Sequence, residues 1–490
     1  MASLDDIRSE RLKKLELLKQ ANQNPFPIHC ERSHSLKEVG SEFDPLSEAK
    51  TEVKLVGRLM ARRGQGALIF FDLFDGTGKF QAVAKKDTLG EDSLGLFDTT
   101  VDVGDFVAVT GTLFTTKQGE KTLEVTSWQM LAKSLRPLPD KWAGLQDVEE
   151  RFRKRYLDTL TDETVRTRFI TRSKIITEIR NFLNSDGFLE VETSMLQQLA
   201  GGATATPFVT HHEALDIDLS LRVAPELDLK KMMIGGFPMI YEIGRSFRNE
   251  GIDPTHNPEF TSLEAYAAFS DATAERARVE KLFKQVIQKV FGSDILTYDG
   301  QTISFAEPFA VVKYLDLIKE YTGLDNVMDM SEGDLLKEAT KLGLSIDPNL
   351  PKEKIIDHIY KKACRPKVIQ PTFLVDYPVE FAPLAKRRED DPRLIDRFQL
   401  LVGGTELVNG FSELNDPIDQ RARFMEQEKN KAKGDNEAQP KDEDFLEAME
   451  YGMPPACGWG IGIDRLVMLL TDVQTIKEVI YFPTLRPKGE

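Results

Sequence analysis

Three glycines near the end of the chain recur at every second position, in the segment Gly458-Trp-Gly-Ile-Gly-Ile-Asp-Arg465. In a strand, that period places all three on one face, which carries no side chains and can lie flat against a planar ligand such as adenine. Arg465 follows where we expect a helix to begin, so a guanidinium and free backbone N–H groups would suit a phosphate. The segment therefore predicts a nucleotide site that is neither a dinucleotide-binding fingerprint nor a phosphate-binding loop. The alternative is a glycine kink in a tightly packed strand.

A second segment predicts two antiparallel strands joined by a long polar loop. Apolar and polar residues alternate over 237–250, the pattern breaks over 251–258, and it resumes over 259–266. Arg248 and Glu250 are two residues apart, so we expect them to share one face of the first strand. The alternative is a strand hairpin that carries these charges by chance.

The two segments together resemble a known protein class. Phe-Arg-x-Glu at 247–250, with Gly-x-Gly-x-Gly-x-x-Arg far downstream, resembles motifs 2 and 3 of class II aminoacyl-tRNA synthetases. Further matches identify the resemblance more narrowly as one to the class II lysyl-tRNA synthetases, and it covers nearly the whole chain. The segments that carry it are 222–227, 247–251, 256–260, 403–413 and 458–465.

Five short strand candidates between 51 and 133 indicate a small barrel. They lie at 53–60, 67–74, 79–83, 106–113 and 121–128. Such a set, with glycine turns between strands, is typical of an OB fold, a common reader of single-stranded nucleic acid. In the family that the chain resembles, this module holds the anticodon, and the matching residues are Arg63, Phe70 and Gln81. Phe70 would stack on a base and Gln81 would hydrogen-bond to its edge, unless Phe70 belongs to the barrel core beside Phe71 and Phe74.

The resemblance and the sequence pattern together imply an α+β multidomain chain. It would comprise a five-stranded OB-fold β-barrel and a class II catalytic domain built on an antiparallel sheet flanked by helices. The expected parts are a helical extension at 1–50, the anticodon-binding barrel at 51–133, a linker at 134–150, and the catalytic domain at 151–490 with a helical insertion at about 307–367. Motif 1 implies a homodimer, although Ser194 replaces the proline that this motif carries in the family.

The resemblance implies that lysine is activated by ATP and then transferred to lysine tRNA. Negative charge must be held on a five-coordinate phosphorus, so positioning and cations carry the catalysis. Three residues match the catalytic positions: Arg248 for the α-phosphate and the substrate carboxylate, and His256 with Arg465 for the γ-phosphate. Phe260 would stack on adenine, and Glu250 would read the adenine amino group.

The amino-acid pocket that the resemblance implies is rich in carboxylates. Glu226 matches the residue that binds the α-amino group, assisted by the backbone of Gly202. The side-chain pocket for the ε-ammonium matches Glu264, Tyr266, Asn409, Phe411 and Glu413. Buried carboxylates attract a cation and repel an aspartate substrate, so the set favours lysine.

The magnesium site that the resemblance implies is altered. In the family, two carboxylates seven residues apart hold Mg²⁺ on ATP, and here they fall on Gln399 and Glu406. A glutamine offers a carbonyl oxygen without a charge, so we expect Glu406 to be the main ligand. Glu406 has the opposite parity to Asn409, Phe411 and Glu413, and a bulge near Val408 or Gly410 would reconcile them.

Composition narrows the remaining possibilities. The net charge of −16 argues against a general nucleic-acid coat. The three cysteines are isolated, His211-His212 lacks a third metal ligand, and no run approaches 18 apolar residues. We therefore expect a cytoplasmic protein that does not span a membrane. Gln399 and Ser194 leave open a related protein with impaired catalysis that binds tRNA or lysine, and delivery of activated lysine to another acceptor is a third possibility.

Overall fold

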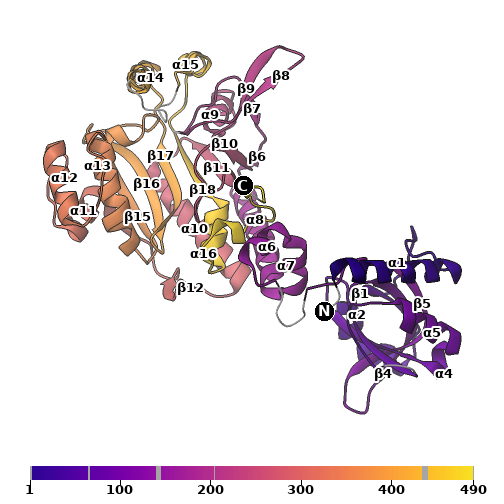
Figure 1. The fold of residues 1–490 in the computed structure, drawn as a ribbon. Helices are drawn as coiled ribbons and strands as arrows, with labels where there is room; N and C mark the ends of the chain where they lie inside the picture. Colours follow the sequence, from indigo (N-terminus) through magenta and orange to yellow (C-terminus); the bar gives the residue numbers. More distant parts are fainter. Residues whose placement is uncertain (1–2, 65–66, 140–144, 204, 433–439, 489–490) are drawn as a thin grey trace. The chain divides into compact units, whose positions relative to one another are not determined.

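The computed structural model of the chain describes residues 3–64, 67–139, 145–203, 205–432 and 440–488. It forms two compact units, Met1–Gln146 and Asp147–Glu490 (Figure 1). Across those described ranges, no helix combines the length and the apolar character needed to cross a membrane.

The first unit contains a closed five-stranded barrel with the strand order β1-β2-β3-β5-β4, which confirms the predicted OB fold. Its strands are β1 (Val53–Arg63), β2 (Leu68–Phe74), β3 (Lys79–Lys85), β4 (Phe106–Thr115) and β5 (Lys121–Ala132). Buried and half-buried residues alternate along β1, as expected for strands with one face in a core. In that core, the ring of Phe97 lies 5.1 Å from the rings of both Phe71 and Trp128.

Five helices accompany the barrel. They are α1 (Leu4–Gln20), α2 (Leu36–Ser41), α3 (Phe43–Glu48), α4 (Lys86–Leu89) and α5 (Glu91–Thr100). Helix α1 begins after Ser3, whose hydroxyl accepts a hydrogen bond from the backbone N–H of Asp6 in a capping box. It is tied to the barrel because Lys14 pairs with Asp102 at 2.7 Å and Arg11 donates to the backbone of Ser134.

The second unit is built on an eight-stranded sheet with the order β14-β15-β16-β17-β18-β11-β10-β6. The strands are β6 (Leu189–Glu190), β10 (Met239–Phe247), β11 (Glu259–Ala268), β14 (Ala310–Lys313), β15 (Thr372–Pro378), β16 (Leu394–Val402), β17 (Thr405–Ser412) and β18 (Ala456–Gly462). The six central strands pair antiparallel, and only the edge pairs, β14 with β15 and β6 with β10, are parallel. The predicted antiparallel sheet is therefore confirmed.

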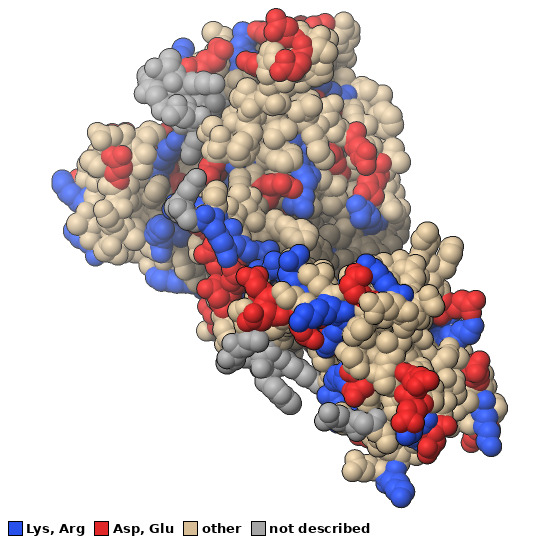
Figure 2. Space-filling view, turned by 45° about the vertical axis from the view of Figure 1, so that its right-hand side comes forward, with Lys and Arg blue, Asp and Glu red and all other residues tan. Residues whose placement is uncertain are grey.

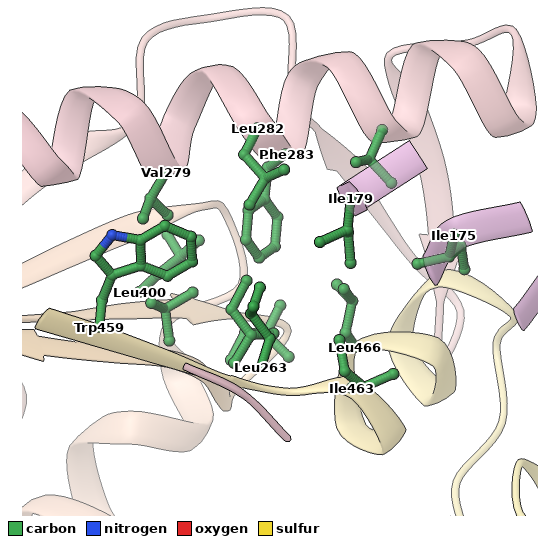
Figure 3. Close-up of a cluster of buried hydrophobic side chains, with 14 of the residues drawn as sticks. Ile175, Ile179, Leu263, Val279, Leu282, Phe283, Leu400, Trp459, Ile463 and Leu466 are labelled. Carbon is green, nitrogen blue, oxygen red and sulfur yellow. The ribbon is translucent and has the colours of Figure 1, made fainter. Parts of the chain in front are cut away.

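Helices cover one face of this sheet (Figure 3). Val279, Leu282 and Phe283 of α10 (Ala272–Phe291) point at Trp459 and other side chains of the sheet. Helices α8 (Glu163–Ser185) and α16 (Ile463–Leu470) extend the same cluster. Each fully buried large apolar side chain contributes about 1.5–3 kcal/mol to stability, so this face is fixed as the interior and the opposite face is left for a site.

The remaining elements surround the sheet. Two small sheets consist of β12 (Ile295–Tyr298) with β13 (Gln301–Ser304), and of β7 (Leu196–Gln197), β9 (Ile217–Leu221) and β8 (Val209–His212). The further helices are α6 (Val148–Arg153), α7 (Arg155–Thr161), α9 (Glu226–Ile234), α11 (Tyr314–Thr322), α12 (Glu332–Lys341), α13 (Lys352–Ile359), α14 (Pro417–Ala432) and α15 (Glu443–Glu450). Short helical turns occur at η1 (Tyr360–Cys364), η2 (Arg365–Lys367), η3 (Val379–Phe381) and η4 (Ile476–Glu478).

Two predicted segments have particular outcomes in the structure. The range 307–367 contains α11, α12, α13 and the π-helical turn η1, and it also supplies the edge strand β14. Helix α6 begins at Val148, inside the range 134–150 that the sequence assigns to a linker, and residues 140–144 of that range lie outside the described residues.

Charged side chains of both signs are mixed on the surface. Figure 2 shows lysine and arginine interspersed with aspartate and glutamate over the visible face of each unit. With a net charge of −16, any binding of a polyanion on this face must depend on local groups and not on a broad positive field.

Candidate active site

The face of the sheet opposite the helices carries an open cavity of about 460 Å³. Because strand side chains alternate, Leu263 lies in the core while Glu264 borders the cavity. All the residues predicted to bind lysine border it, namely Gly202, Glu226, Arg248, Glu264, Tyr266, Asn409, Phe411 and Glu413. Phe260, Glu406 and Arg465 border it too.

A bulge in β17 brings Glu406 to the same face as the lysine-pocket residues. Gly403 and Gly404 both have positive φ, 57° and 72°, and form the two-residue turn between β16 and β17. Leu401 then pairs with Glu406, but Leu400 pairs with Val408, so Leu407 is the extra residue. The bulge predicted near Val408 or Gly410 thus lies at Leu407, next to the first of these positions.

The glycine-rich strand has a different role from the one that its spacing predicts. Gly458, Gly460 and Gly462 do share one face of β18 and border the cavity. A Cβ on Gly458, however, would lie 2.3 Å from the Tyr266 ring and 2.5 Å from Oε1 of Glu413. The bare surface at Gly458 therefore accommodates the protein's own pocket side chains. Only Gly460 and Gly462 leave space for a ligand.

Three carboxylates meet at one end of the cavity, where Glu226, Glu264 and Glu413 border it. The hydroxyl of Tyr266 donates a hydrogen bond to Oε2 of Glu264 at 3.0 Å. Lys230, which the motif comparison did not include, places its Nζ 2.6 Å from Glu226 and 2.5 Å from Glu413. Lys230 lies four residues after Glu226 on α9, so helical spacing alone could have predicted that these two side chains are neighbours.

Burial and mutual repulsion alter the protonation of these groups. Burial, reinforced by the charge of Glu226, raises the pKa of Glu264 to about 8. Burial also raises the pKa of Glu413 to about 8, although the ammonium of Lys230 opposes the change. The pKa of Lys230 is raised, because its two carboxylate partners outweigh the effect of burial. Lys230 is therefore a cation, and the carboxylates are poised to ionise when a further cation arrives.

Arg248 borders the cavity, but it does not lie in the expected local structure. Strand β10 ends at Phe247, so Arg248 and Glu250 lie in the following loop and the prediction that they share a strand face is wrong. The loop is anchored because the N–H of Arg248 donates to the backbone oxygen of Pro258 at 2.8 Å. The Arg248 guanidinium lies 5.1 Å from the centre of the Phe260 ring, and its buried Nε has no hydrogen-bond partner.

His256 and Arg465 come together although they are far apart in sequence. Nη2 of Arg465 lies 2.8 Å from Nε2 of His256, and Nδ1 of His256 lies 2.7 Å from a carboxylate oxygen of Asp253. A guanidinium can only donate, so Nε2 must accept and the imidazole proton must lie on Nδ1, toward Asp253. His256, Arg465 and Glu250 border a second hollow, and Arg248 and Phe260 border both this hollow and the main cavity.

A buried ion pair holds the start of α16 and therefore positions Arg465. The carboxylate of Asp464 accepts a hydrogen bond from Arg172 of α8 at 2.6 Å and another from the N–H of Thr261 in β11 at 2.7 Å. Asp464 is 2% exposed, so these contacts are shielded from water. The role of Arg172 could not be predicted from the sequence, because its partner lies almost three hundred positions away.

A second buried arginine organises the entry to α9. Arg222 is 0% exposed, and it donates to Glu242 at 2.5 Å, to Thr193 and to the backbone oxygen of Arg245. These bonds connect motif 1, the strand β10 and the loop before Glu226. The geometry of the carboxylate cluster therefore depends on a hydrogen-bond network outside the cavity.

The position of Gln399 differs from that of a metal ligand. Its Oε1 accepts hydrogen bonds from the hydroxyls of Tyr377 at 2.5 Å and Tyr360 at 3.2 Å. Glu406 borders the cavity, as do the cationic residues Arg397 and Lys361, which the sequence did not single out. Across the residues that the structure describes, no cluster of three or more His, Cys, Asp or Glu is arranged to hold a metal; His211 instead contacts Asp218 on the neighbouring strand.

The residues predicted to read an anticodon lie on the outside of the barrel. Arg63 of β1 is opposite Phe70 of β2, and its guanidinium lies 5.6 Å from the centre of the Phe70 ring. Phe70 is half-buried, whereas Phe71 and Phe74 are buried, so Phe70 is not part of the core. Gln81 lies on β3 opposite Asp72, two positions along β2 from Phe70.

Comparison with known proteins places the chain in a family. Residues 147–486 match the family described as class II tRNA synthetases (D, K and N), and residues 53–131 match the OB-fold nucleic acid binding domain. The chain is 47% identical over 485 residues to the lysine–tRNA ligase of Carboxydothermus hydrogenoformans and 47% identical over 486 residues to that of Moorella thermoacetica. It is 45% identical over 493 residues to that of Enterococcus faecalis, and each alignment covers 99% of both chains.

The chain therefore belongs to the class II aminoacyl-tRNA synthetases. Within that class, it belongs to the lysine–tRNA ligase family, whose members use ATP. The resemblance found in the sequence is confirmed.

Proposed function

We propose that this chain activates lysine with ATP and transfers it to the 3′ end of lysine tRNA, with the residues of the cavity in the roles given below. The observation that carries the proposal is one cavity bordered both by the carboxylates of Glu226, Glu264 and Glu413 and by the arginines Arg248 and Arg465. A cationic amino acid and a polyphosphate need charged groups of both signs in one cavity. A relative with impaired catalysis gains no support, since every residue predicted to bind lysine or ATP borders one of the two hollows.

In the first step, a carboxylate oxygen of lysine attacks the α-phosphorus of ATP, and the bond to pyrophosphate breaks. Arg248 would hold the lysine carboxylate and the α-phosphate together, because its guanidinium offers paired donors and its buried Nε lacks a partner. In the second step, a ribose hydroxyl at the 3′ end of the tRNA attacks the acyl carbon, and AMP leaves.

The hollow beside Arg248 would hold the rest of ATP. Phe260 offers an aromatic face for adenine, and Glu250 offers a carboxylate for its amino group. The paired side chains of His256 and Arg465 would bind the γ-phosphate.

Magnesium, when bound with ATP, would neutralise phosphate charge. Glu406 borders the cavity and fits this role, whereas the Gln399 carbonyl oxygen is already hydrogen-bonded to two tyrosines. We therefore assign Glu406 as a ligand and leave Gln399 out of the coordination.

The carboxylate end of the cavity would select lysine. Glu226 and the Gly202 backbone would bind the α-ammonium, while Glu264 and Glu413, with Tyr266, Asn409 and Phe411, would surround the ε-ammonium. An uncharged side chain would leave buried carboxylates unpaired, at a cost of several kcal/mol. This penalty supports selectivity without a separate editing step.

The barrel would bind the anticodon through Arg63, Phe70 and Gln81. A half-buried aromatic ring beside a guanidinium, on the outside of an OB fold, is suited to stacking on a base.

The second unit would form a homodimer through the segment that follows motif 1. This segment exposes the apolar side chains of Met195, Leu196 and Leu199, as expected of a segment that another copy of the chain covers. The three cysteines are free thiols, which suits a cytoplasmic location.

Purified protein should catalyse lysine-dependent ATP–pyrophosphate exchange and should charge lysine tRNA. Arg248→Ala should reduce exchange by about 10²–10³-fold, the usual cost of removing one charge-stabilising donor. Arg245→Ala, near the end of β10 and paired with Glu259, serves as the matched control. Activation of aspartate or asparagine ahead of lysine would overturn the assignment, and near-normal exchange by Arg248→Ala would remove that residue from the mechanism.

The anticodon role is tested separately from activation. Phe70→Ala should raise KM for tRNA in charging roughly tenfold, because one stacked base contributes ~1–3 kcal/mol, and should leave lysine-dependent exchange unchanged. Phe114→Ala, another half-buried ring on the barrel with a lysine over it, should behave as wild type. Equal effects of the two variants on charging would argue against a specific role for Phe70.

Lysine binding should depend on pH. Because the pKa values of Glu264 and Glu413 are about 8 in the empty cavity, binding of an ammonium group must displace protons below that pH. The KM for lysine should therefore fall as the pH rises toward 8 and level off above it, while the KM for ATP changes little. Titration calorimetry in buffers of different ionisation enthalpy should detect proton release at pH 7, and its absence would contradict this prediction.

The dimer proposal predicts that Leu196→Asp weakens association, because a charge would be buried in an apolar interface. Sedimentation velocity should show a shift from dimer to monomer at micromolar concentration. Ile418→Asp, at a more exposed apolar position on α14, should remain dimeric. A wild-type protein that sediments as a monomer would refute the proposal.

A further inference from the structure

Lys230 is buried behind the carboxylates that border the cavity. Its side chain is 1% exposed, and its Nζ donates a hydrogen bond to Oε1 of Glu226 at 2.6 Å. The same Nζ lies 2.5 Å from Oε2 of Glu413 and 5.4 Å from the centre of the Phe411 ring. One ammonium group thus joins two carboxylates that come from α9 and from the end of β17.

The contact with Glu413 is close but incomplete. Both carboxylate oxygens of Glu413 are buried and receive no hydrogen bond of regular geometry. The close contact of Nζ with Oε2 therefore supplies charge compensation and leaves Oε1 open as an acceptor. A buried carboxylate in this state is costly unless a second donor arrives, and an ammonium group of a ligand is such a donor.

The charges of the pocket match lysine only when Lys230 is counted. The carboxylates of Glu226, Glu264 and Glu413 carry three negative charges when ionised, and Lys230 offsets one. The remaining two equal the charges of the α- and ε-ammonium groups of lysine. Arg248 is then available for the substrate carboxylate.

We propose that Lys230 is a positioning residue for amino-acid selection, which holds the carboxylates of Glu226 and Glu413 at a fixed separation. The inference rests on the proposed function, because it takes these two glutamates as the binding groups for the α- and ε-ammonium of lysine. With their separation fixed, both carboxylates can be contacted only by a substrate whose two ammonium groups are the matching distance apart. Ornithine, which is one methylene shorter, cannot satisfy both carboxylates at once.

Removal of Lys230 would let the two carboxylates repel each other and move apart. The pocket would then fit lysine less well and would discriminate less against shorter diamines. Removal of Lys230 would also change the titration of Glu413, because Lys230 alone among the groups that face Glu413 lowers its pKa. These groups are Glu226 and Lys230 on α9, Glu264 and Tyr266 on β11, and Cys457 on β18.

The test compares Lys230→Met with Lys231→Met, the same substitution at the next position of α9, where the side chain borders a different hollow. Lys230→Met should raise the KM for lysine in pyrophosphate exchange by roughly 30-fold or more, the low end for truncating one partner of a buried charge pair. The preference for lysine over ornithine should fall by about tenfold, within the range for one methylene. The pH at which the KM for lysine levels off should move upward, and the KM for ATP should stay unchanged.

The outcomes separate this inference from the proposed function. If wild-type protein shows no lysine-dependent exchange, the proposed function fails. If wild type is active, and Lys230→Met melts at a lower temperature but keeps the lysine KM, the ornithine ratio and the pH profile of Lys231→Met, then Lys230 is only structural and the inference is overturned.

A second comparison applies if Lys230→Met does not fold. The double variant Lys230→Met/Glu413→Gln removes both buried charges of that pair and is measured against Glu413→Gln alone. Because Lys230 is proposed to fix the separation of Glu226 and Glu413, and Glu413→Gln already removes one of these charges, loss of Lys230 in this background should change the preference for lysine over ornithine by less than about threefold. A loss as large as that expected in the wild-type background would overturn the inference.

Discussion

The burial of one face of the eight-stranded sheet decides where every proposed binding side chain points. Helices α8, α10 and α16 cover the face that carries Leu263, Leu400 and Trp459. A strand presents alternate residues to opposite sides, so Glu264 and Gly460 must face the cavity once their neighbours are in the core. A slip of one residue in β11 would place a carboxylate in the hydrophobic core. The packing of apolar side chains therefore determines the placement of the charges.

Much of this arrangement could be predicted from the sequence, because local patterns carry it. Alternation identified the barrel strands and the hairpin of β10 and β11, and motif matches identified the residues that border the cavity. Long-range pairings were not accessible in this way. The buried contacts of Arg172 with Asp464 and of Arg222 with Glu242 join segments whose proximity depends on the whole fold.

The errors have local physical causes. The sequence pattern predicts Arg248 and Glu250 on a strand, but β10 ends at Phe247. The N–H of Arg248 instead donates a hydrogen bond to the backbone oxygen of Pro258 in the loop. Gly458 was expected to make room for a ligand, and it makes room for Tyr266 and Glu413. In each case the residue type was informative, but the neighbour that it contacts could be identified only from the folded structure.

The grouping of two carboxylates around one resident ammonium also limits how such a protein can change during evolution. A single substitution that replaces any one of Glu226, Lys230 or Glu413 leaves an uncompensated charge in a buried space. A route toward a neutral amino acid would have to pass through such intermediates or alter two positions at once. Selectivity for a dibasic substrate is thus maintained by the contacts themselves and also by the instability of the single-substitution intermediates.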